Sequence, residues 1–285
     1  MPEAHPVIRI LHQLERWAPP VAAELAYSMW LSPGRRKRVH RAEELVMAQA
    51  RSTTLRVGSA TVPVYAWGDG GNPVLLVHGW RGRAAELTEF VRELRSDERT
   101  VIAFDAPSHG AASRGKADIR VFARIIQQLH EQFGDFEAII AHSFGSPAAT
   151  LALRQGATAG RLVSIGGVAE MDYLADHFGR TLQLRPSTIA GLRRRVERRR
   201  FADVPDVWTS LSSTAHPVEI PLLIVHDADD PVVEVTQAHA LAEAHPASTS
   251  LISQGLGHTR ILRDDEVLNA VAEFINAPAF SGYAL

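Results

Sequence analysis

The sequence predicts an α/β fold in which a mostly parallel sheet of eight strands is flanked by helices. From residue 53 onward, short apolar runs alternate with longer segments of helical periodicity, and the six later runs carry no charge. Uncharged aliphatic runs of this length are typical of strands buried on both faces. The expected strands span residues 55–57, 62–65, 74–77, 101–104, 138–140, 162–165, 222–225 and 250–252.

Two segments fall outside this alternation. Before residue 53 the spacing of Ile8, Leu11 and Leu14 is helical, and two prolines at 19–20 force a break. The interval from 168 to 217 is too long for a single crossover helix. We therefore expect an N-terminal helical extension over 1–52, a core over 53–167 and 218–285, and a helical cap insertion over 168–217.

Composition limits the possible functions. The chain has 285 residues, a net charge of −2, 46% hydrophobic and 22% charged residues, and no cysteine. A charge so near zero gives no support for a nucleic-acid partner, and the lack of cysteine excludes disulfides and thiolate chemistry. The N-terminus lacks the pattern of a secretory signal, and its most apolar run, 21–31, falls short of the ~20 residues that span a bilayer. We expect no transmembrane segment and a cytoplasmic location.

The strongest local motif is I-I-A-H-S-F-G-S at residues 139–146, where an apolar strand meets a serine between small residues. A sharp strand-to-helix turn strains the backbone of the residue at its apex, so the positions two before and two after must be small. Ala141 and Gly145 meet this requirement. The motif therefore predicts a nucleophile elbow with Ser143 at its apex.

An acid and a histidine follow later expected strands, in the chain order serine, aspartate, histidine. Residues 221–233 form an apolar strand that ends in an acidic turn, and we prefer Asp230 as the functional carboxylate because it lies just beyond the strand. Asp227 and Asp229 compete for this role, but we expect them to cap the turn. His258 lies in a glycine-flanked loop after the last strand, where the backbone can approach a site closely.

With these motifs, the chain from about 53 to 277 resembles the α/β-hydrolase superfamily in its capped form. The segment V-L-L-V-H-G-W at 74–80 is similar to the family's strand ending in His-Gly, and F-D-A-P-S-H-G at 104–110 is similar to its Asp-x-Pro-Gly-His-Gly loop. The resemblance implies an oxyanion hole formed by the backbone N–H groups of Trp80 and Phe144. Ala141, Ser108 and Asp227 stand where the family commonly has glycine.

The resemblance implies a serine hydrolase with Ser143 as nucleophile, His258 as general base and Asp230 as the carboxylate that orients the base. The expected substrate is a small-molecule carboxylic ester, or less readily a thioester or an amide. Carbon–carbon bond hydrolases and cofactor-free perhydrolases share the triad and remain alternatives, as does a non-catalytic binding protein on the same scaffold. We expect no cofactor, and no metal because the histidines lack metalloprotease spacing. His78, His109 and His142 are expected to support loop geometry by hydrogen bonding.

The insertion carries an arginine-rich segment, 191–201, that predicts a helix. One interpretation is a lid helix with a solvated basic face. The other is that Arg194, Arg195 or Arg198 binds a substrate carboxylate or phosphate, with Arg81 beside the oxyanion loop. Aromatic residues are not interleaved with these arginines, as single-stranded nucleic-acid binding would favour. The N-terminal helices could cover the core, form a homodimer contact or lie on a membrane surface.

Overall fold

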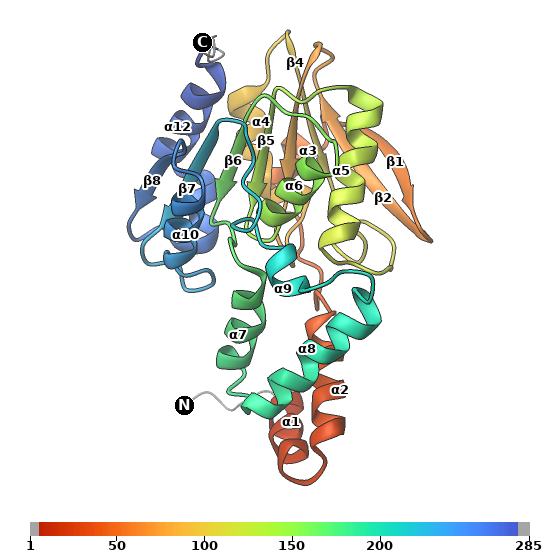
Figure 1. The fold of residues 1–285 in the computed structure, drawn as a ribbon. Helices are drawn as coiled ribbons and strands as arrows, with labels where there is room; N and C mark the ends of the chain where they lie inside the picture. Colours follow the sequence, from red (N-terminus) through yellow and green to blue (C-terminus); the bar gives the residue numbers. More distant parts are fainter. Residues whose placement is uncertain (1–5, 279–285) are drawn as a thin grey trace. The chain divides into compact units, whose positions relative to one another are not determined.

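A computed structural model describes residues 6–278 and divides them into two compact units (Figure 1). One unit comprises the described residues up to Gly34 together with Glu170–His216, and the other comprises Arg35–Ala169 and the described residues from Pro217 onward. The boundary at Gly34 falls inside the segment 1–52, so its first helices belong with the insertion and its remainder belongs with the core.

The core unit contains one eight-stranded sheet, in the order β1-β2-β4-β3-β5-β6-β7-β8. The first two strands and β4 pair antiparallel, and all other neighbours are parallel. Each of the eight expected strands is present, which confirms the predicted fold class. The strands are β1(Arg51–Val57), β2(Ala60–Trp67), β3(Asn72–Val77), β4(Arg99–Phe104), β5(Ala138–His142), β6(Leu162–Ile165), β7(Leu222–Asp227) and β8(Thr249–Ser253).

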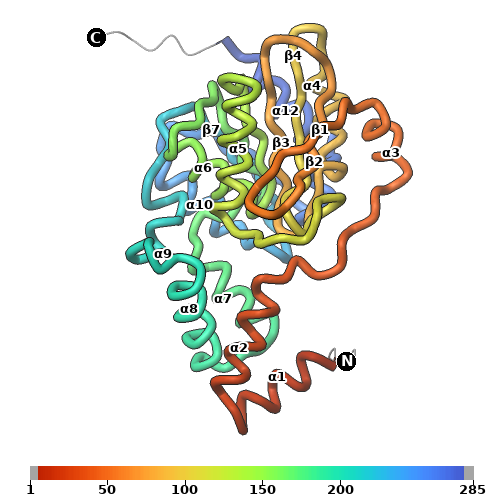
Figure 2. The backbone as a smooth tube through the Cα atoms, turned by 90° about the vertical axis from the view of Figure 1, so that its right-hand side faces the viewer, coloured from red at the N-terminus to blue at the C-terminus, as the bar shows by residue number. Residues whose placement is uncertain are grey.

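Helices cover both faces of this sheet. Figure 2 shows α5(Ile119–Phe133) and α6(Gly145–Arg154) on one side and α3(Arg41–Met47) on the other. The face of α3 also holds α4(Thr88–Leu94) and α12(Asp265–Asn276), whose side chains join one apolar cluster with the strands. Since both faces are covered, the strands can be aliphatic throughout, as the sequence indicated. The polar groups of the core are therefore found where strands end.

The other unit is entirely helical. It consists of α1(Pro6–Trp17), α2(Pro19–Trp30), α7(Met171–Thr181), α8(Pro186–Arg200) and α9(Val207–Ser210). The break between α1 and α2 falls at the expected prolines. A Cβ on Gly191 of α8 would lie 2.7 Å from the Cβ of Ala23 on α2, so small residues let these two helices approach closely. Within residues 6–278, no helix is both long and apolar enough to cross a bilayer.

Candidate active site

The predicted catalytic residues follow the carboxyl ends of three parallel strands in the same half of the sheet. Ser143 comes directly after β5, Asp230 lies three residues beyond β7, and His258 lies five residues beyond β8. Trp80 comes three residues after β3, which is paired with β5. Because the carboxyl ends of parallel strands meet at one edge of a sheet, these residues are brought to the same edge, where α/β folds place their ligands.

The serine has the backbone that an elbow requires. Its φ angle is 55°, in the left-handed region that a non-glycine residue adopts only under strain. Neighbouring glycines make room for it: a Cβ on Gly145 would lie 2.7 Å from the carbonyl oxygen of Val77, and a Cβ on Gly79 would lie 2.7 Å from the Cβ of Ser143. The elbow therefore packs directly against the end of β3.

The acid and the base are in direct contact. The Nδ1–H of His258 donates to Oδ2 of Asp230 at 2.7 Å, while Oδ1 of Asp230 accepts the N–H groups of Val232 and Val233 at 2.7 and 3.0 Å. Burial opposes ionisation of Asp230, but the hydrogen bond from His258 and those backbone N–H groups lower its pKa below the ordinary value. Asp230 is thus held as an anion, and the remaining ring nitrogen of His258, Nε2, is left to act as a base.

His142 connects the elbow to the histidine loop. Its Nε2–H donates to the carbonyl oxygen of His258 at 2.9 Å, and the two rings lie 4.6 Å apart between centroids. Burial, with a smaller effect of His258, lowers the pKa of His142 to about 3, so its ring stays neutral near neutral pH. The residue that precedes Ser143 therefore contacts the residue proposed to deprotonate it.

The backbone after β6 completes this edge, although no role was predicted for it from the sequence. The N–H of Ser143 donates to the carbonyl oxygen of Ile165 at 2.9 Å. The next residue, Gly166, has a φ of 53°, and a Cβ there would lie 3.3 Å from Nδ1 of His258 and 3.5 Å from Oδ2 of Asp230. A glycine directly after a buried strand was the available signal for such a close approach.

The two expected oxyanion donors lie on adjoining segments. The rings of Trp80 and Phe144 are 5.3 Å apart between centroids, in an edge-to-face arrangement. Within residues 6–278, neither backbone N–H has a hydrogen-bond acceptor. Free N–H groups beside a strained serine are the donors that a developing oxyanion needs.

Two buried side chains fix the loops around these donors. Asp105, after β4, accepts the N–H groups of Ala84 and Ala111 at 2.8 and 2.7 Å, and so joins the loop after β3 to the loop after β4. Nε2 of His78 accepts the N–H of Ala106 at 3.0 Å, and its Nδ1–H donates to the carbonyl oxygen of Gly79 at 2.8 Å. Burial lowers the pKa of His78, in agreement with this neutral tautomer.

One departure from the family pattern has a visible consequence. Ser108 has a φ of 65°, a conformation that glycine adopts without strain, and its hydroxyl compensates by bonding to both the carbonyl oxygen and the N–H of Gly115. His109, in the same loop, donates from Nδ1 to the carbonyl oxygen of Pro107 at 2.9 Å. Burial, with a smaller effect of His78, lowers the pKa of His109 to about 3. The three histidines expected to support loop geometry therefore do so.

The segment before α3 contacts the loop that follows β3 and Trp80. The Lys37 ammonium pairs with Glu86, whose carboxylate also accepts the N–H of Arg83 at 3.1 Å. The Arg83 guanidinium donates to the carbonyl oxygen of Lys37 at 2.9 Å. This network holds residues 37 and 83–86 together, close in sequence to Trp80.

The four arginines predicted to bind substrate differ in their surroundings. Arg81 is exposed, with a φ of 63°, and Arg194 and Arg198 are exposed on α8. Arg195 instead donates to a carboxylate oxygen of Glu24 at 2.9 Å and to the carbonyl oxygens of Pro20 and Gly191, both at 2.9 Å. These contacts join α2 to α8.

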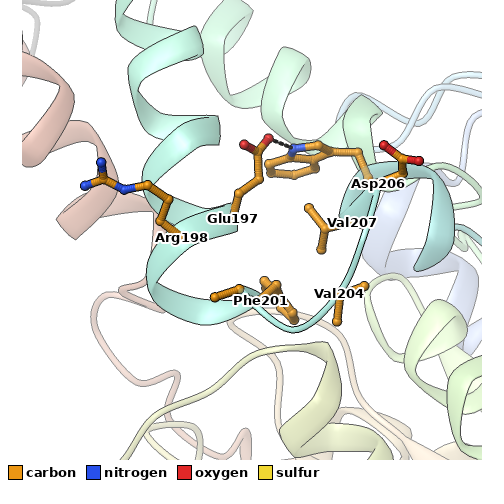
Figure 3. Close-up of a pocket in the computed structure, with 8 residues that line it drawn as sticks. Glu197, Arg198, Phe201, Val204, Asp206 and Val207 are labelled. Carbon is orange, nitrogen blue, oxygen red and sulfur yellow. Dashed lines mark hydrogen bonds between the residues drawn. The ribbon is translucent and has the colours of Figure 1, made fainter.

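A pocket of about 470 Å³ lies within the helical unit, between the end of α8 and α9 (Figure 3). Its wall includes Phe201 and Trp208, whose indole N–H donates to Glu197 at 2.7 Å. Arg198 lines its rim, with the guanidinium pointing away from the hollow in Figure 3. None of the residues predicted to be catalytic lines this pocket.

Comparisons with known proteins agree with this architecture. Residues 74–271 match the model of the alpha/beta hydrolase family, and the chain therefore belongs to that family. No curated protein matches the sequence. Similar solved structures include an esterase, RhEst1, from Rhodococcus sp. ECU1013 (17% identity, TM-score 0.59, 80% of this chain and 99% of that chain) and a bromoperoxidase from Bacillus anthracis (18%, 0.59, 80% and 100%). A thioesterase domain from the curacin biosynthetic pathway is also similar (14%, 0.58, 80% and 99%).

Proposed function

We propose that this alpha/beta hydrolase cleaves a carboxylic ester, or less readily a thioester or an amide, through an acyl-enzyme formed on Ser143. The observation that carries the proposal is the 2.7 Å hydrogen bond between His258 and Asp230, at the sheet edge where Ser143 has a φ of 55°. An acid, a base and a strained serine at one edge are the components of nucleophilic acyl transfer.

In the proposed first step, Ser143 Oγ attacks the substrate carbonyl carbon as Nε2 of His258 takes the hydroxyl proton. The carbonyl oxygen becomes an oxyanion, which the N–H groups of Trp80 and Phe144 stabilise. Asp230 stabilises the imidazolium that forms. When the tetrahedral intermediate collapses, His258 returns the proton to the leaving alcohol and the acyl group stays on Ser143.

Water completes the reaction. His258 removes a proton from a water molecule as its oxygen attacks the acyl carbon, and a second oxyanion forms in the same place. Collapse breaks the bond to Ser143 Oγ, which regains a proton from His258. The products are a carboxylic acid and the resting enzyme, and Asp230 remains ionised throughout.

We further propose Arg81 as a contact for an anionic group on the substrate, because it directly follows Trp80 and its side chain is exposed. Arg194 and Arg198 are alternatives on the helical unit. Arg195 is the least suitable of the four, since Glu24 already neutralises it. Cytoplasmic location and a homodimer stay predictions.

A serine-directed probe tests the mechanism. We expect a fluorophosphonate to label the wild-type protein and the Ser146→Ala control, which removes a buried hydroxyl from the adjoining helix α6, but not Ser143→Ala. Ester turnover should fall on the order of a millionfold in Ser143→Ala, as for other serine hydrolases. Labelling that persists in Ser143→Ala would contradict the proposal.

The substrate class can be examined with p-nitrophenyl esters of increasing acyl length. The acyl chain length that gives the highest kcat/KM defines the ester specificity. Labelling of Ser143 without ester turnover would favour carbon–carbon cleavage or perhydrolysis, and absence of both would favour a binding protein.

A further inference from the structure

The carboxylate of Asp227 has no part in the proposed reaction, although it lies three residues before Asp230 on the same strand and turn. Its side chain is fully buried, with 0% of its surface exposed. Oδ2 accepts the Ser253 hydroxyl at 2.8 Å and the Leu256 N–H at 2.9 Å, while Oδ1 accepts the Asp229 N–H at 3.1 Å. Ser253 ends β8, and Leu256 lies in the loop that leads from β8 to His258.

That loop needs external support because its own sequence is permissive. Gly255 and Gly257 have φ angles of 80° and 66°, so two of the three residues that precede His258 are glycines in the left-handed region. Asp229 provides one more hydrogen bond to this loop, since its Oδ2 accepts the Gly255 N–H at 3.1 Å. Carboxylates from the turn after β7 thus fix the course of residues 253–257.

We propose that Asp227 is a positioning residue that sets the place of His258 by fixing the loop before it. This inference rests on the proposed role of His258 as base. Asp230 contacts the ring of His258, whereas Asp227 contacts the backbone of the loop that precedes His258. The two acids therefore act on the position of His258 in different ways. Asp227 caps its turn as expected, by accepting the Asp229 N–H, and it also joins that turn to the neighbouring loop through Leu256.

The arrangement requires a carboxylate rather than an amide. An ionised carboxylate only accepts hydrogen bonds, and both of its oxygens face donors here. An asparagine at this position would turn its NH₂ group toward either the Asp229 N–H or the Ser253 and Leu256 donors. Burial opposes ionisation of Asp227, but hydrogen bonds from the N–H groups of Gly257 and Leu256 and from Ser253 lower its pKa below the ordinary value.

The first test compares Asp227→Asn with Glu137→Gln on folded protein. Glu137 directly precedes β5, at the opposite end of that strand from Ser143, and its carboxylate pairs with Arg99 at 2.7 Å. We expect Asp227→Asn to lower kcat and the fluorophosphonate labelling rate about a hundredfold, the cost of displacing a catalytic group by about 1 Å, with little change in KM. Glu137→Gln should keep wild-type rates. Ser253→Ala, which removes one donor and leaves the backbone donors in place, should have an effect of about tenfold or less.

A second measurement does not depend on turnover. The ring resonances of His258, assigned by their loss in His258→Ala, should broaden or shift in Asp227→Asn and remain unchanged in Glu137→Gln. If the wild-type protein shows neither labelling nor turnover, the hydrolase proposal fails, and these spectra still test the positioning role. Wild-type rates per folded molecule together with unchanged His258 resonances in Asp227→Asn would overturn the inference.

Discussion

The charged groups of the two units are stabilised in opposite ways. At the carboxyl edge of the sheet, Asp227 and Asp230 are buried and receive backbone N–H groups from fixed turns. In the helical unit, Glu24 leaves 44% of its side chain exposed and pairs with Arg195 and Arg199. Backbone donors hold a buried carboxylate in one orientation, whereas the side chains of an exposed ion pair can adopt many orientations. This difference agrees with the proposal that the chemistry takes place in the first region, and we expect substitutions in the second region to cost little.

The largest expected effect comes from removing the acid at the sheet edge. Asp230→Asn should lower kcat about ten-thousandfold while the fold is kept, because an amide favours the wrong tautomer of His258. Steady-state kinetics with a p-nitrophenyl ester measure this loss, and circular dichroism confirms folding. The comparison predicts no such loss for Asp176→Asn, which removes the exposed partner of Arg193 at 2.8 Å in the helical unit.

The free energy of unfolding of the core should fall at acid pH because two buried histidines oppose protonation. This loss should exceed the loss from protonating exposed ion pairs. Burial lowers the pKa of both His109 and His142 to about 3, so the folded core binds fewer protons than the unfolded chain between about pH 6.5 and pH 3. Their contribution to stability is complete above pH 6.5 and is lost as the pH falls through that window. The loss should be roughly 1 kcal/mol per pH unit for each histidine.

Urea unfolding at pH 7 and pH 5 measures this loss. Since His142→Gln removes one titrating group, its free energy of unfolding should depend less on pH than that of the wild type. The control is His239→Gln, which changes an exposed histidine of the same unit and should keep the wild-type dependence. Equal dependence in all three proteins would contradict the assignment.

A smaller effect is expected at the exposed arginine beside Trp80. Arg81→Ala should raise KM several-fold for an ester that carries a carboxylate and leave KM for a neutral ester unchanged, since an exposed charge contributes about 1 kcal/mol or less. Arg198→Ala provides the comparison from the helical unit. A rise in KM with Arg198→Ala alone would transfer anion recognition to that unit.

The smallest effect is expected for the ion pairs of the helical unit. Glu24→Gln removes the partner of Arg195 and Arg199, yet these side chains are exposed enough for water to replace it. Thermal unfolding should change by only a few degrees at low salt, and by less at high salt because salt screens exposed charges. A loss of thermal stability as large as that from replacing a buried carboxylate would contradict the difference between the two units.

The sequence predicted the sheet and the placement of Ser143, Asp230 and His258 after its strands because both depend on local patterns. Aliphatic runs mark strands buried on both faces, and strand ends in a parallel sheet share an edge. It did not predict that His142 bonds to the loop of His258, or that Gly166 approaches His258 and Asp230, since these contacts depend on which strand lies beside which. The arginines of α8 could not be ranked either, because the partner of Arg195 is Glu24, 171 residues away in sequence.

The helical unit has a consequence for the order of biosynthesis. Helix α2 is made before the core segment Arg35–Ala169, whereas α8, against which α2 packs, is made only after that segment. Until then the part of α2 that packs against α8, which includes the buried Ala23, lacks that neighbour. Nascent chains with this arrangement expose an apolar helix face for many seconds, which favours binding by chaperones during synthesis.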